Sequence, residues 1–179
     1  MHFDFIKEVI ATEVEIYLKL KTPLTSQEIN QLSSVHIESP KNIEPYNLDI
    51  YFDQQSDWTH INAMSGLSKE QYLDCLLNSK LKVAMYGFMP GFVYLSGLPQ
   101  QLHIPRKSTP DKRIPANSFA IGGNYAGIYS IASPGGWHIL GTIKKTVFNK
   151  ESVPPLQLRI GQQIIINSIS KDDLTKPKT

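Results

Sequence analysis

The sequence predicts an α+β protein that is mainly β, in which a small α/β amino-terminal lobe at residues 1–81 precedes a β-barrel at residues 82–170. Two observations predict this division. Short β-prone runs separated by Gly and Pro fill the chain from Lys82 onward, which favours a closed or nearly closed barrel. Helical patterns with N-cap residues lie before that point. The runs expected as barrel strands are residues 83–86, 92–95, 118–121, 127–131, 137–143 and 163–166.

The amino-terminal lobe begins with a strand and a short helix. Apolar residues alternate with other residues from Val14 to Leu20, the period-two pattern of a half-buried strand, and the strand is expected to end before Pro23. Thr25 or Ser26 then offers an N-cap for a short helical stretch. The lobe is therefore expected to contain both kinds of secondary structure.

A second strand and a clearer helix complete this lobe. The sequence pattern at residues 48–52 predicts a short strand. Ser68 and Gln71 have the spacing of a capping box, and the helix that follows presents one apolar face, which consists of Tyr72, Leu73, Leu76 and Leu77. At the other end of the chain, residues 171–179 are expected to form a mobile polar tail.

The composition is typical of a globular protein. Of the 179 residues, 41% are hydrophobic and 19% are charged, and 18 basic residues against 16 acidic ones give a formal net charge of +2, which does not require a nucleic-acid partner. No apolar run approaches the ~20 residues of a membrane-spanning helix. The single cysteine, Cys75, cannot form an intramolecular disulfide and has no metal-ligand neighbours in the sequence. We therefore expect a soluble cytoplasmic protein without a metal site.

The candidate site lies in a Gly- and Pro-rich stretch of the barrel half. No Walker loop, HExxH motif, CxxC pair or GxSxG elbow occurs in the sequence. The segment GFMPGFVYLSGLP at residues 87–99 must make tight turns while it holds aromatic rings. SPGGWHILG at residues 133–141 repeats this feature, because Gly135 and Gly136 allow positive φ or the close approach of another chain or ligand beside Trp137.

Three segments of this stretch closely resemble the signature blocks of a known family. GFMPGFVYLSGL, IPRKSTPDKRIPANSFAI and AGIYSIASPGGWHILG occur in this order within residues 83–141. They are similar to the blocks of the B subunit of 5-oxoprolinase, whose family is also described as allophanate hydrolase subunit 1 or kinase A inhibitor and contains carboxyltransferase subdomains C and D. The resemblance covers residues 48–169.

The resemblance implies a two-lobed fold whose carboxy-terminal lobe is a cyclophilin-like β-barrel. It also implies a heteromeric assembly with a companion barrel subunit and a third, LamB/YcsF-type subunit. Such an assembly opens the lactam of 5-oxo-L-proline to L-glutamate while it hydrolyses ATP, so ATP is expected as a co-substrate of the complex, with no metal or biotin on this chain. Two alternatives are a protein-binding inhibitor of a sensor histidine kinase and a carboxyltransferase-type subunit of an allophanate or urea amidohydrolase.

Several polar positions of the family pattern differ in this chain. The family's QTGIYP is YAGIYS at residues 125–130, its VPAGS is IPANS at residues 114–118, and its second TPR is Thr109-Pro110-Asp111. Several polar groups of the family pattern are therefore absent from the region expected to face a ligand. An altered substrate or lost catalysis is thus an alternative to the activity that the resemblance implies.

Nine residues of these blocks are the candidates for binding. Arg106 matches the family motif, and a guanidinium can bind a carboxylate or phosphate through two parallel hydrogen bonds. Large rings with a polar tip suit a pocket or a subunit interface, although core packing explains them equally well. No catalytic residue can be named. The expected substrate- or nucleotide-binding residues are Arg106, Lys107, Tyr94, Gly135, Gly136 and Trp137, and the expected partner contacts are Phe88, Pro90 and Phe92.

Overall fold

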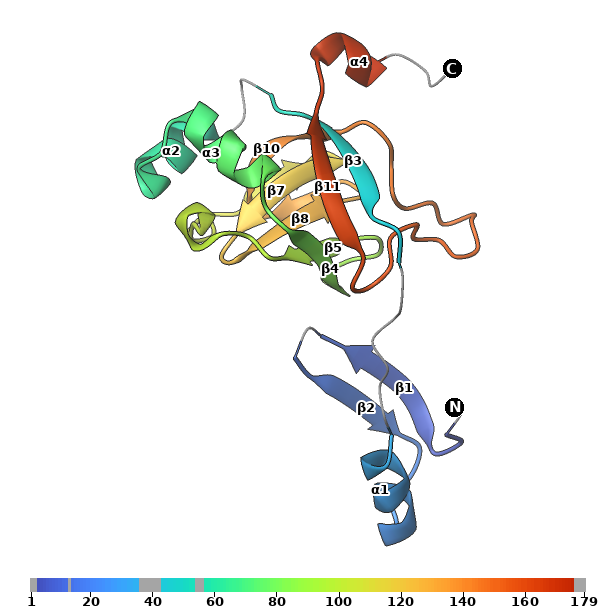
Figure 1. Ribbon diagram of the computed structural model, residues 1–179. Helices are drawn as coiled ribbons and strands as arrows, with labels where there is room; N and C mark the ends of the chain where they lie inside the picture. Colours follow the sequence, from blue (N-terminus) through green and yellow to red (C-terminus); the bar gives the residue numbers. More distant parts are fainter. Residues whose placement is uncertain (1–2, 13, 36–42, 54–56, 176–179) are drawn as a thin grey trace. The chain divides into compact units, whose positions relative to one another are not determined.

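The chain forms two compact units, residues 1–42 and residues 43–179 (Figure 1). The computed structural model describes residues 3–12, 14–35, 43–53 and 57–175. The boundary expected near residue 81 therefore lies earlier in the chain. The reason is β3 (Tyr46–Tyr51), which the sequence pattern assigns to the amino-terminal lobe but which pairs with two strands of the barrel.

The first unit consists of a β-hairpin and a helix. β1 (Ile6–Ala11) pairs antiparallel with β2 (Ile16–Leu20), which confirms the predicted strand, whereas β1 lacks the alternation that would have predicted it. The helix α1 (Ser26–Ser33) begins after Thr25, the N-cap, whose hydroxyl accepts the backbone N–H of Glu28. The Glu28 carboxylate in turn accepts the backbone N–H of Thr25 at 2.8 Å. None of the described side chains of this unit is buried.

The second unit is built on a closed barrel of seven strands in the order β10-β3-β11-β4-β5-β8-β7 (Figure 1). Neighbouring strands are antiparallel except β3 and β11, which run parallel. All six predicted barrel strands are confirmed, and β3 is the seventh. They are β4 (Leu81–Tyr86), β5 (Val93–Ser96), β7 (Ser118–Gly122), β8 (Tyr125–Tyr129), β10 (His138–Ile143) and β11 (Gln163–Ser168).

Two further strands form a small separate sheet that the sequence did not predict. β6 (Asp111–Ile114) pairs antiparallel with β9 (Ser133–Gly135), and Asp111 lies opposite Gly135. Proline and glycine are poor strand formers, and their presence within and beside these segments hides the strands from a propensity argument. The pairing has a functional consequence, because it brings the segment that follows Arg106 next to the glycine pair of the third motif.

The buried apolar side chains of the barrel unit form two clusters. The larger one is formed by inward-facing strand residues, among them Ile50, Leu95 and Ile128, each 0% exposed, and it extends to the helices. β7 is buried along its whole length whereas burial alternates in much of β11, and both strands appear in the sequence as short β-prone runs. The smaller cluster, called here the aromatic cluster, consists of Phe92, Ile114, Ala120, Tyr129 and Trp137.

Two helices connect β3 to β4 (Figure 1). α3 (Lys69–Leu77) begins with the predicted Ser68–Gln71 capping box, and it buries Tyr72 and Leu76. The Tyr72 hydroxyl donates a hydrogen bond of 2.7 Å to the carbonyl of Leu102, the last residue of the short 3-10 helix η1 (Gln100–Leu102). α2 (Trp58–Ser65) was not predicted, because it carries only two buried residues and its N-cap residue makes no side-chain capping bond. Both helices contribute to the core of the barrel unit.

The carboxy-terminal segment is more ordered than expected. The predicted polar tail begins with a short helix, α4 (Lys171–Thr175), and residues 176–179 lie outside the described residues. Within the described residues, no helix combines the length and the apolar character needed to cross a membrane.

Candidate functional site

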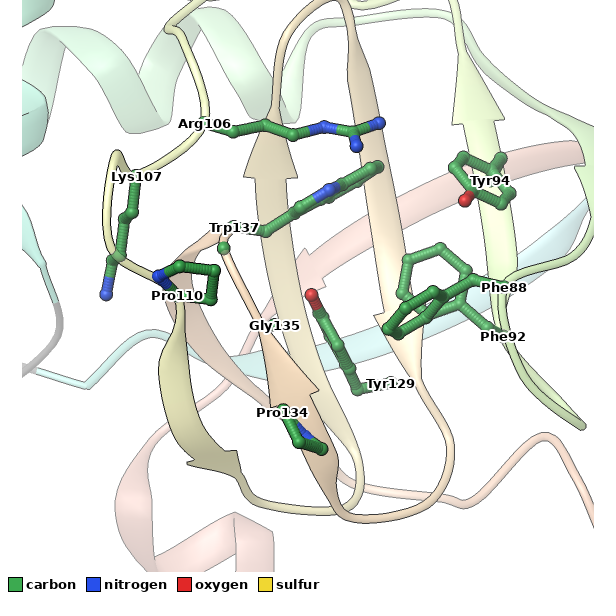
Figure 2. A pocket seen from close by; sticks show the side chains of 11 residues that line it. Phe88, Phe92, Tyr94, Arg106, Lys107, Pro110, Tyr129, Pro134, Gly135 and Trp137 are labelled. Carbon is green, nitrogen blue, oxygen red and sulfur yellow. The ribbon is translucent and has the colours of Figure 1, made fainter.

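A pocket of about 350 Å³ opens beside the aromatic cluster (Figure 2). It is formed where β5, β8 and β9 meet the segment between η1 and β6. All six residues predicted to bind substrate or nucleotide line it, together with residues that the sequence did not single out for binding. The lining residues are Phe88, Phe92, Tyr94, Arg106, Lys107, Pro110, Tyr129, Pro134, Gly135, Gly136 and Trp137.

One wall of the pocket is a set of aromatic rings packed edge to face. The ring of Phe92 lies at its centre, with centroids 4.7 Å from Tyr94, 4.8 Å from Tyr129 and 5.4 Å from Trp137. Edge-to-face packing places positive ring edges against negative ring faces, which stabilises the cluster beyond its buried area. The absence of a side chain at Gly127 makes room for this packing, because a Cβ there would lie 2.7 Å from the indole of Trp137. The wall is thus a rigid apolar surface.

Arg106 supplies the cationic side of the pocket. Its guanidinium carbon lies 5.5 Å from the ring centre of Trp137, and Figure 2 shows the group extended over the indole. An arginine in this position is attracted by the negative face of the ring. Within the described part of the chain, no carboxylate forms an ion pair with Arg106. The guanidinium can therefore offer its N–H donors to an anionic ligand.

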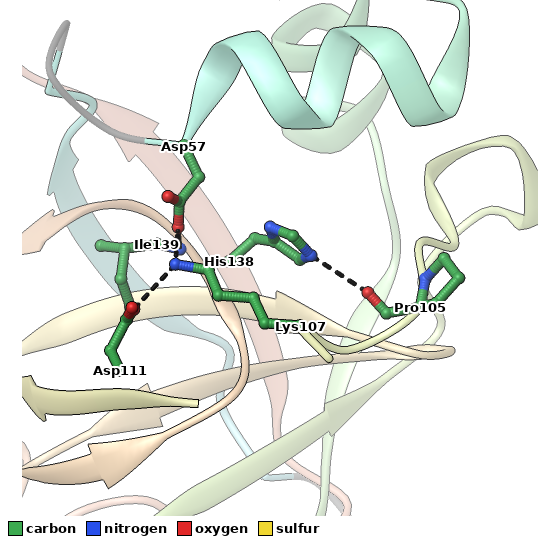
Figure 3. A network of polar contacts seen from close by, with 6 residues as sticks. All are labelled: Asp57, Pro105, Lys107, Asp111, His138 and Ile139. Carbon is green, nitrogen blue, oxygen red and sulfur yellow. Dashed lines mark hydrogen bonds and ion pairs between the residues drawn. The ribbon is translucent and has the colours of Figure 1, made fainter. Parts of the chain in front are cut away.

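Lys107 lines the same pocket, but its charge is directed elsewhere. Its Nζ lies 2.7 Å from a carboxylate oxygen of Asp57 and 2.7 Å from one of Asp111 (Figure 3), and Figure 2 shows the amine pointing away from the rings. Burial opposes the charged form, yet the hydrogen bonds and ion pairs with Asp111 and Asp57 raise the pKa of Lys107 above its ordinary value. The sequence expectation that this ammonium faces a ligand is not matched by the geometry.

The two adjacent glycines occupy their positions for different structural reasons. A Cβ at Gly135 would overlap the hydroxyl of Tyr129 and would lie 2.8 Å from Ile114 Cδ1. A Cβ at Gly136 would lie 3.4 Å from the carbonyl oxygen of Lys107 and 3.7 Å from Pro110 Cγ, so it would be accommodated more easily. Neither glycine has the positive φ that the sequence allowed. Gly135 is therefore required for close approach, which was the other expected reason, and Gly136 contributes mainly its carbonyl, which accepts the N–H of Lys107 at 2.7 Å.

Tyr129 is a pocket residue that the sequence analysis did not select. Burial raises its pKa to about 12, and burial likewise raises the pKa of Tyr94, although the charge of Arg106 opposes that second shift. Both phenols are therefore protonated hydrogen-bond donors at neutral pH. Strand alternation could have indicated Tyr129, because it lies two residues after Gly127 and so on the same face of β8, the face that packs against Trp137.

The three residues predicted to contact a partner fall into two groups. Phe88 is 61% exposed at the pocket, and Pro90 is also exposed, so both are available to a second protein. Phe92 is only 1% exposed and belongs to the aromatic cluster. The prediction for Phe92 was wrong, because its ring is covered by Tyr94, Tyr129 and Trp137 of the same chain.

The pocket contains no evident general base among its described lining residues. His138 follows Trp137, and its Nε2 pairs with the carbonyl of Pro105 at 3.0 Å outside the pocket (Figure 3). Burial lowers the pKa of His138 and keeps the ring neutral. Its ring lies 6.3 Å from that of His60, a proximity that the sequence did not predict. Among the described residues, no group of three or more His, Cys, Asp or Glu side chains could hold a metal ion.

The pocket can bind a small ligand in a defined orientation. An apolar ring can lie against the aromatic wall, an anionic group can reach Arg106, and the protonated phenols of Tyr94 and Tyr129 can donate to a carbonyl. The lining residues that the structure describes include no carboxylate, imidazole or thiol that could act as a base or nucleophile. The arrangement positions a ligand, and the reactive groups would have to be supplied by another chain or by a co-substrate.

Comparisons with known proteins agree with this fold. Residues 2–158 match the model of a family described as the carboxyltransferase domain, subdomain C and D. The chain is 37% identical over 117 residues to the B subunit of 5-oxoprolinase from Bacillus subtilis (strain 168), a match that covers 65% of this chain and 49% of that protein. It is 46% identical over 82 residues to the corresponding 5-oxoprolinase B subunit of Haemophilus influenzae, covering 46% of this chain and 38% of the relative.

A solved structure shows the same architecture. The crystal structure of TTHA0988 superposes with a TM-score of 0.80 at 26% identity, covering 93% of this chain and 33% of the other. The region shared with this chain spans about half the length of the Bacillus subtilis protein, so the curated relatives are longer than that region. Because the family model matches most of the chain and the barrel carries the signature segments around one pocket, this protein belongs to the family of the carboxyltransferase domain, subdomains C and D.

Proposed function

We propose that this chain is a subunit of a heteromeric, ATP-dependent 5-oxoprolinase, in which it binds 5-oxo-L-proline for ring opening to L-glutamate. The single observation that carries this proposal is the pocket, which combines Arg106 with an aromatic wall and has no carboxylate, imidazole or thiol among its described lining residues. The names of the relatives in Bacillus subtilis and Haemophilus influenzae support the same interpretation.

The chemistry of 5-oxoproline fits the groups that line the pocket. The substrate is a small, nearly flat ring with one carboxylate and one lactam. The ring can lie against Phe88 and Tyr94, the more exposed rings of the pocket. The carboxylate can accept two parallel hydrogen bonds from Arg106, and the lactam oxygen can accept one from Tyr129. A phenol whose pKa is about 12 remains a donor throughout the physiological range. The pocket would thus select a small cyclic carboxylate.

The ATP-dependent step requires groups that the pocket does not provide. Phosphorylation of the lactam oxygen would activate the carbonyl carbon for attack by water, after which the C–N bond breaks and phosphate leaves. The transferred phosphoryl group and the rest of the triphosphate carry several negative charges, whereas Arg106 is the only one of the described lining residues whose cation faces the pocket. We therefore assign binding of ATP and activation of water to the companion barrel subunit and the LamB/YcsF-type subunit.

Reconstitution tests this proposal. Glutamate release from 5-oxoproline and ATP would be measured for the isolated chain and for the chain mixed with its companion barrel subunit and the third subunit. We expect no turnover by the isolated chain and turnover by the complete assembly. Robust activity of the isolated chain would contradict the shared site. An intact, verified assembly without activity would contradict the proposed reaction.

A second candidate is a protein-binding inhibitor of a sensor histidine kinase, a role that would require a protein-binding surface such as the one at the exposed Phe88. A ring that is 61% exposed, next to the exposed Pro90, is a surface that a protein partner could cover. Either the companion barrel subunit or a kinase could be the partner that covers this surface. Co-elution with the companion subunit at micromolar concentration, abolished by Phe88→Ser, would support the oxoprolinase assembly. Separate elution would favour the kinase alternative.

A further inference from the structure

Asp57, Lys107 and Asp111 form an ion group directly behind the pocket. The ammonium of Lys107 lies 2.7 Å from each carboxylate, and its side chain is only 14% exposed, against 26% for Asp57 and 43% for Asp111 (Figure 3). The contact with Asp57 is thus the better shielded of the two. Ion pairs lose strength as solvent access increases, so the pair with Asp57 contributes more to fixing Lys107 than the pair with Asp111 does.

Asp57 is itself held by the barrel. Its carboxylate accepts the backbone N–H of Ile139 at 3.0 Å, and its own N–H donates to the carbonyl of Ile139 at 3.3 Å. Ile139 belongs to β10, so the first residue before α2 is tied to a barrel strand at two points. Asp57 therefore presents a carboxylate in a fixed position to Lys107.

The segment that carries Arg106 is tied down on both sides of that residue. The carbonyl of Pro105 pairs with His138 Nε2 at 3.0 Å, and the backbone N–H of Lys107 donates to the carbonyl of Gly136 at 2.7 Å. Because Arg106 and Lys107 are adjacent, their side chains can point to opposite sides of the segment, and Figure 2 shows one extended over Trp137 and the other turned away. These two bonds fix the main chain on either side of Arg106, and the ion group adds a third attachment through the side chain of Lys107.

We propose that Lys107 is a positioning residue: by bridging Asp57 and Asp111 it holds the backbone of Arg106 so that the guanidinium stays extended over Trp137 and faces the pocket. Lys107 does not touch the ligand in this arrangement. The pocket consequently offers one cation and suits a ligand with a single negative charge. The proposal concerns the same pocket as the proposed function, and only this last consequence rests on that function.

The orientation of Arg106 can be measured without any ligand. The Nε–Hε signal of Arg106 in a ¹⁵N NMR spectrum can be assigned by its loss in Arg106→Lys, and a guanidinium over an indole has a ring-current shift. Lys107→Met should move this signal to the position of exposed arginines and should shift the indole N–H signal of Trp137. Lys107→Arg keeps the charge and should restore much of the original shift. Lys112→Met is the matched control, since it removes an exposed lysine next to Asp111 and should leave both signals in place.

Two further variants keep the test decisive if Lys107→Met fails to fold. Asp57→Asn removes the charge but retains an oxygen that can accept the N–H of Ile139, and Asp111→Asn removes the more exposed partner. We expect a large shift of the Arg106 signal for Asp57→Asn and a smaller one for Asp111→Asn. An unmoved Arg106 signal in a folded Lys107→Met or Asp57→Asn protein would overturn the proposal. If wild type fails to bind 5-oxoproline, the proposed function falls, whereas the NMR outcome still decides the role of Lys107.

Discussion

The hairpin unit and the barrel unit differ in how far they bury their apolar side chains. In the hairpin unit, Ile16 is 51% exposed, Tyr17 is 58% exposed and Ile29 of α1 is 49% exposed. In the barrel unit, Ile50 and Ile128 are 0% exposed. A two-stranded sheet leaves one edge of each strand unpaired and has no second layer, whereas a closed barrel pairs every strand and encloses its own core. The barrel unit is therefore stabilised by its own core, whereas the hairpin unit has little buried apolar area to stabilise it.

A matched isoleucine truncation in each unit tests this comparison, and it should produce the largest of the effects predicted here. Ile128→Ala in the barrel should lower the free energy of unfolding by about 2–5 kcal/mol, because it leaves a cavity in a packed interior. Ile16→Ala on the hairpin should cost less than about 0.5 kcal/mol, because that side chain is half exposed already. Urea denaturation followed by circular dichroism measures both. Equal costs would mean that the hairpin is packed as tightly as the barrel.

Arg106→Ala extends the comparison to the pocket, where function and stability should separate. The side chain is exposed, so its removal should change the free energy of unfolding by only about 0.5 kcal/mol. A charge-assisted contact typically contributes about 1.5–3 kcal/mol, so affinity for 5-oxoproline should fall roughly tenfold to a hundredfold. Thermal melts and isothermal titration provide the two readouts, and Lys145→Ala serves as the neutral control. Unchanged affinity would reduce Arg106 to a solvated rim residue.

The two glycines at the pocket provide a sharper test of close packing. Gly135→Ala should destabilise the protein by about 1–3 kcal/mol, because its Cβ would overlap Tyr129 and Ile114, which other rings hold in place. Gly136→Ala should cost clearly less, since the nearest of the surrounding atoms to its Cβ would be the carbonyl oxygen of Lys107, at 3.4 Å. Thermal melting of both variants compares them directly. If Gly136→Ala were the more damaging of the pair, the packing argument for this turn would be wrong.

A smaller effect is expected from pH, through His138. Burial lowers the pKa of this imidazole below its ordinary value of 6.5, so the unfolded chain takes up a proton more readily than the folded protein. The stability associated with neutral His138 is fully present above that value and is lost as the pH falls through the lower pKa of the folded state. Unfolding free energies measured between about pH 7 and about pH 5 should therefore decrease, and His138→Gln should flatten this dependence. An identical slope in the variant would exclude His138 as its source.

Removal of residues 1–42 should have the smallest effect of all. The barrel closes its sheet without them, so the fragment from residue 43 onward should fold and unfold within about 0.5 kcal/mol of the complete chain, the level of a surface substitution. Circular dichroism and urea titration of the fragment would show this. A fragment that fails to fold would reverse the comparison, because it would make the hairpin unit a necessary part of the barrel's stability.

Much of the fold follows from interactions between residues that are close in the sequence. The Ser68–Gln71 capping box located the start of α3, and the N-cap candidates Thr25 and Ser26 placed the start of α1 to within one residue. Short β-prone runs separated by Gly and Pro located six of the barrel strands, because turn residues mark where each strand ends. The Gly- and Pro-rich motifs likewise located the pocket residues Arg106 and Trp137, since special backbone geometry leaves a local signature.

The tertiary structure alone decided which side chains meet. Lys107 looks like a free cation in the sequence, but the fold places it between Asp57 and Asp111, which occupies its charge. Phe92 looks like a surface ring, but three other rings from separate strands and turns cover it. The sequence by itself determined the strands, the caps and the pocket motifs, because these depend on near neighbours. Charge pairing and ring burial depend on the approach of segments that are distant in the sequence, and only the closed barrel brings those segments together.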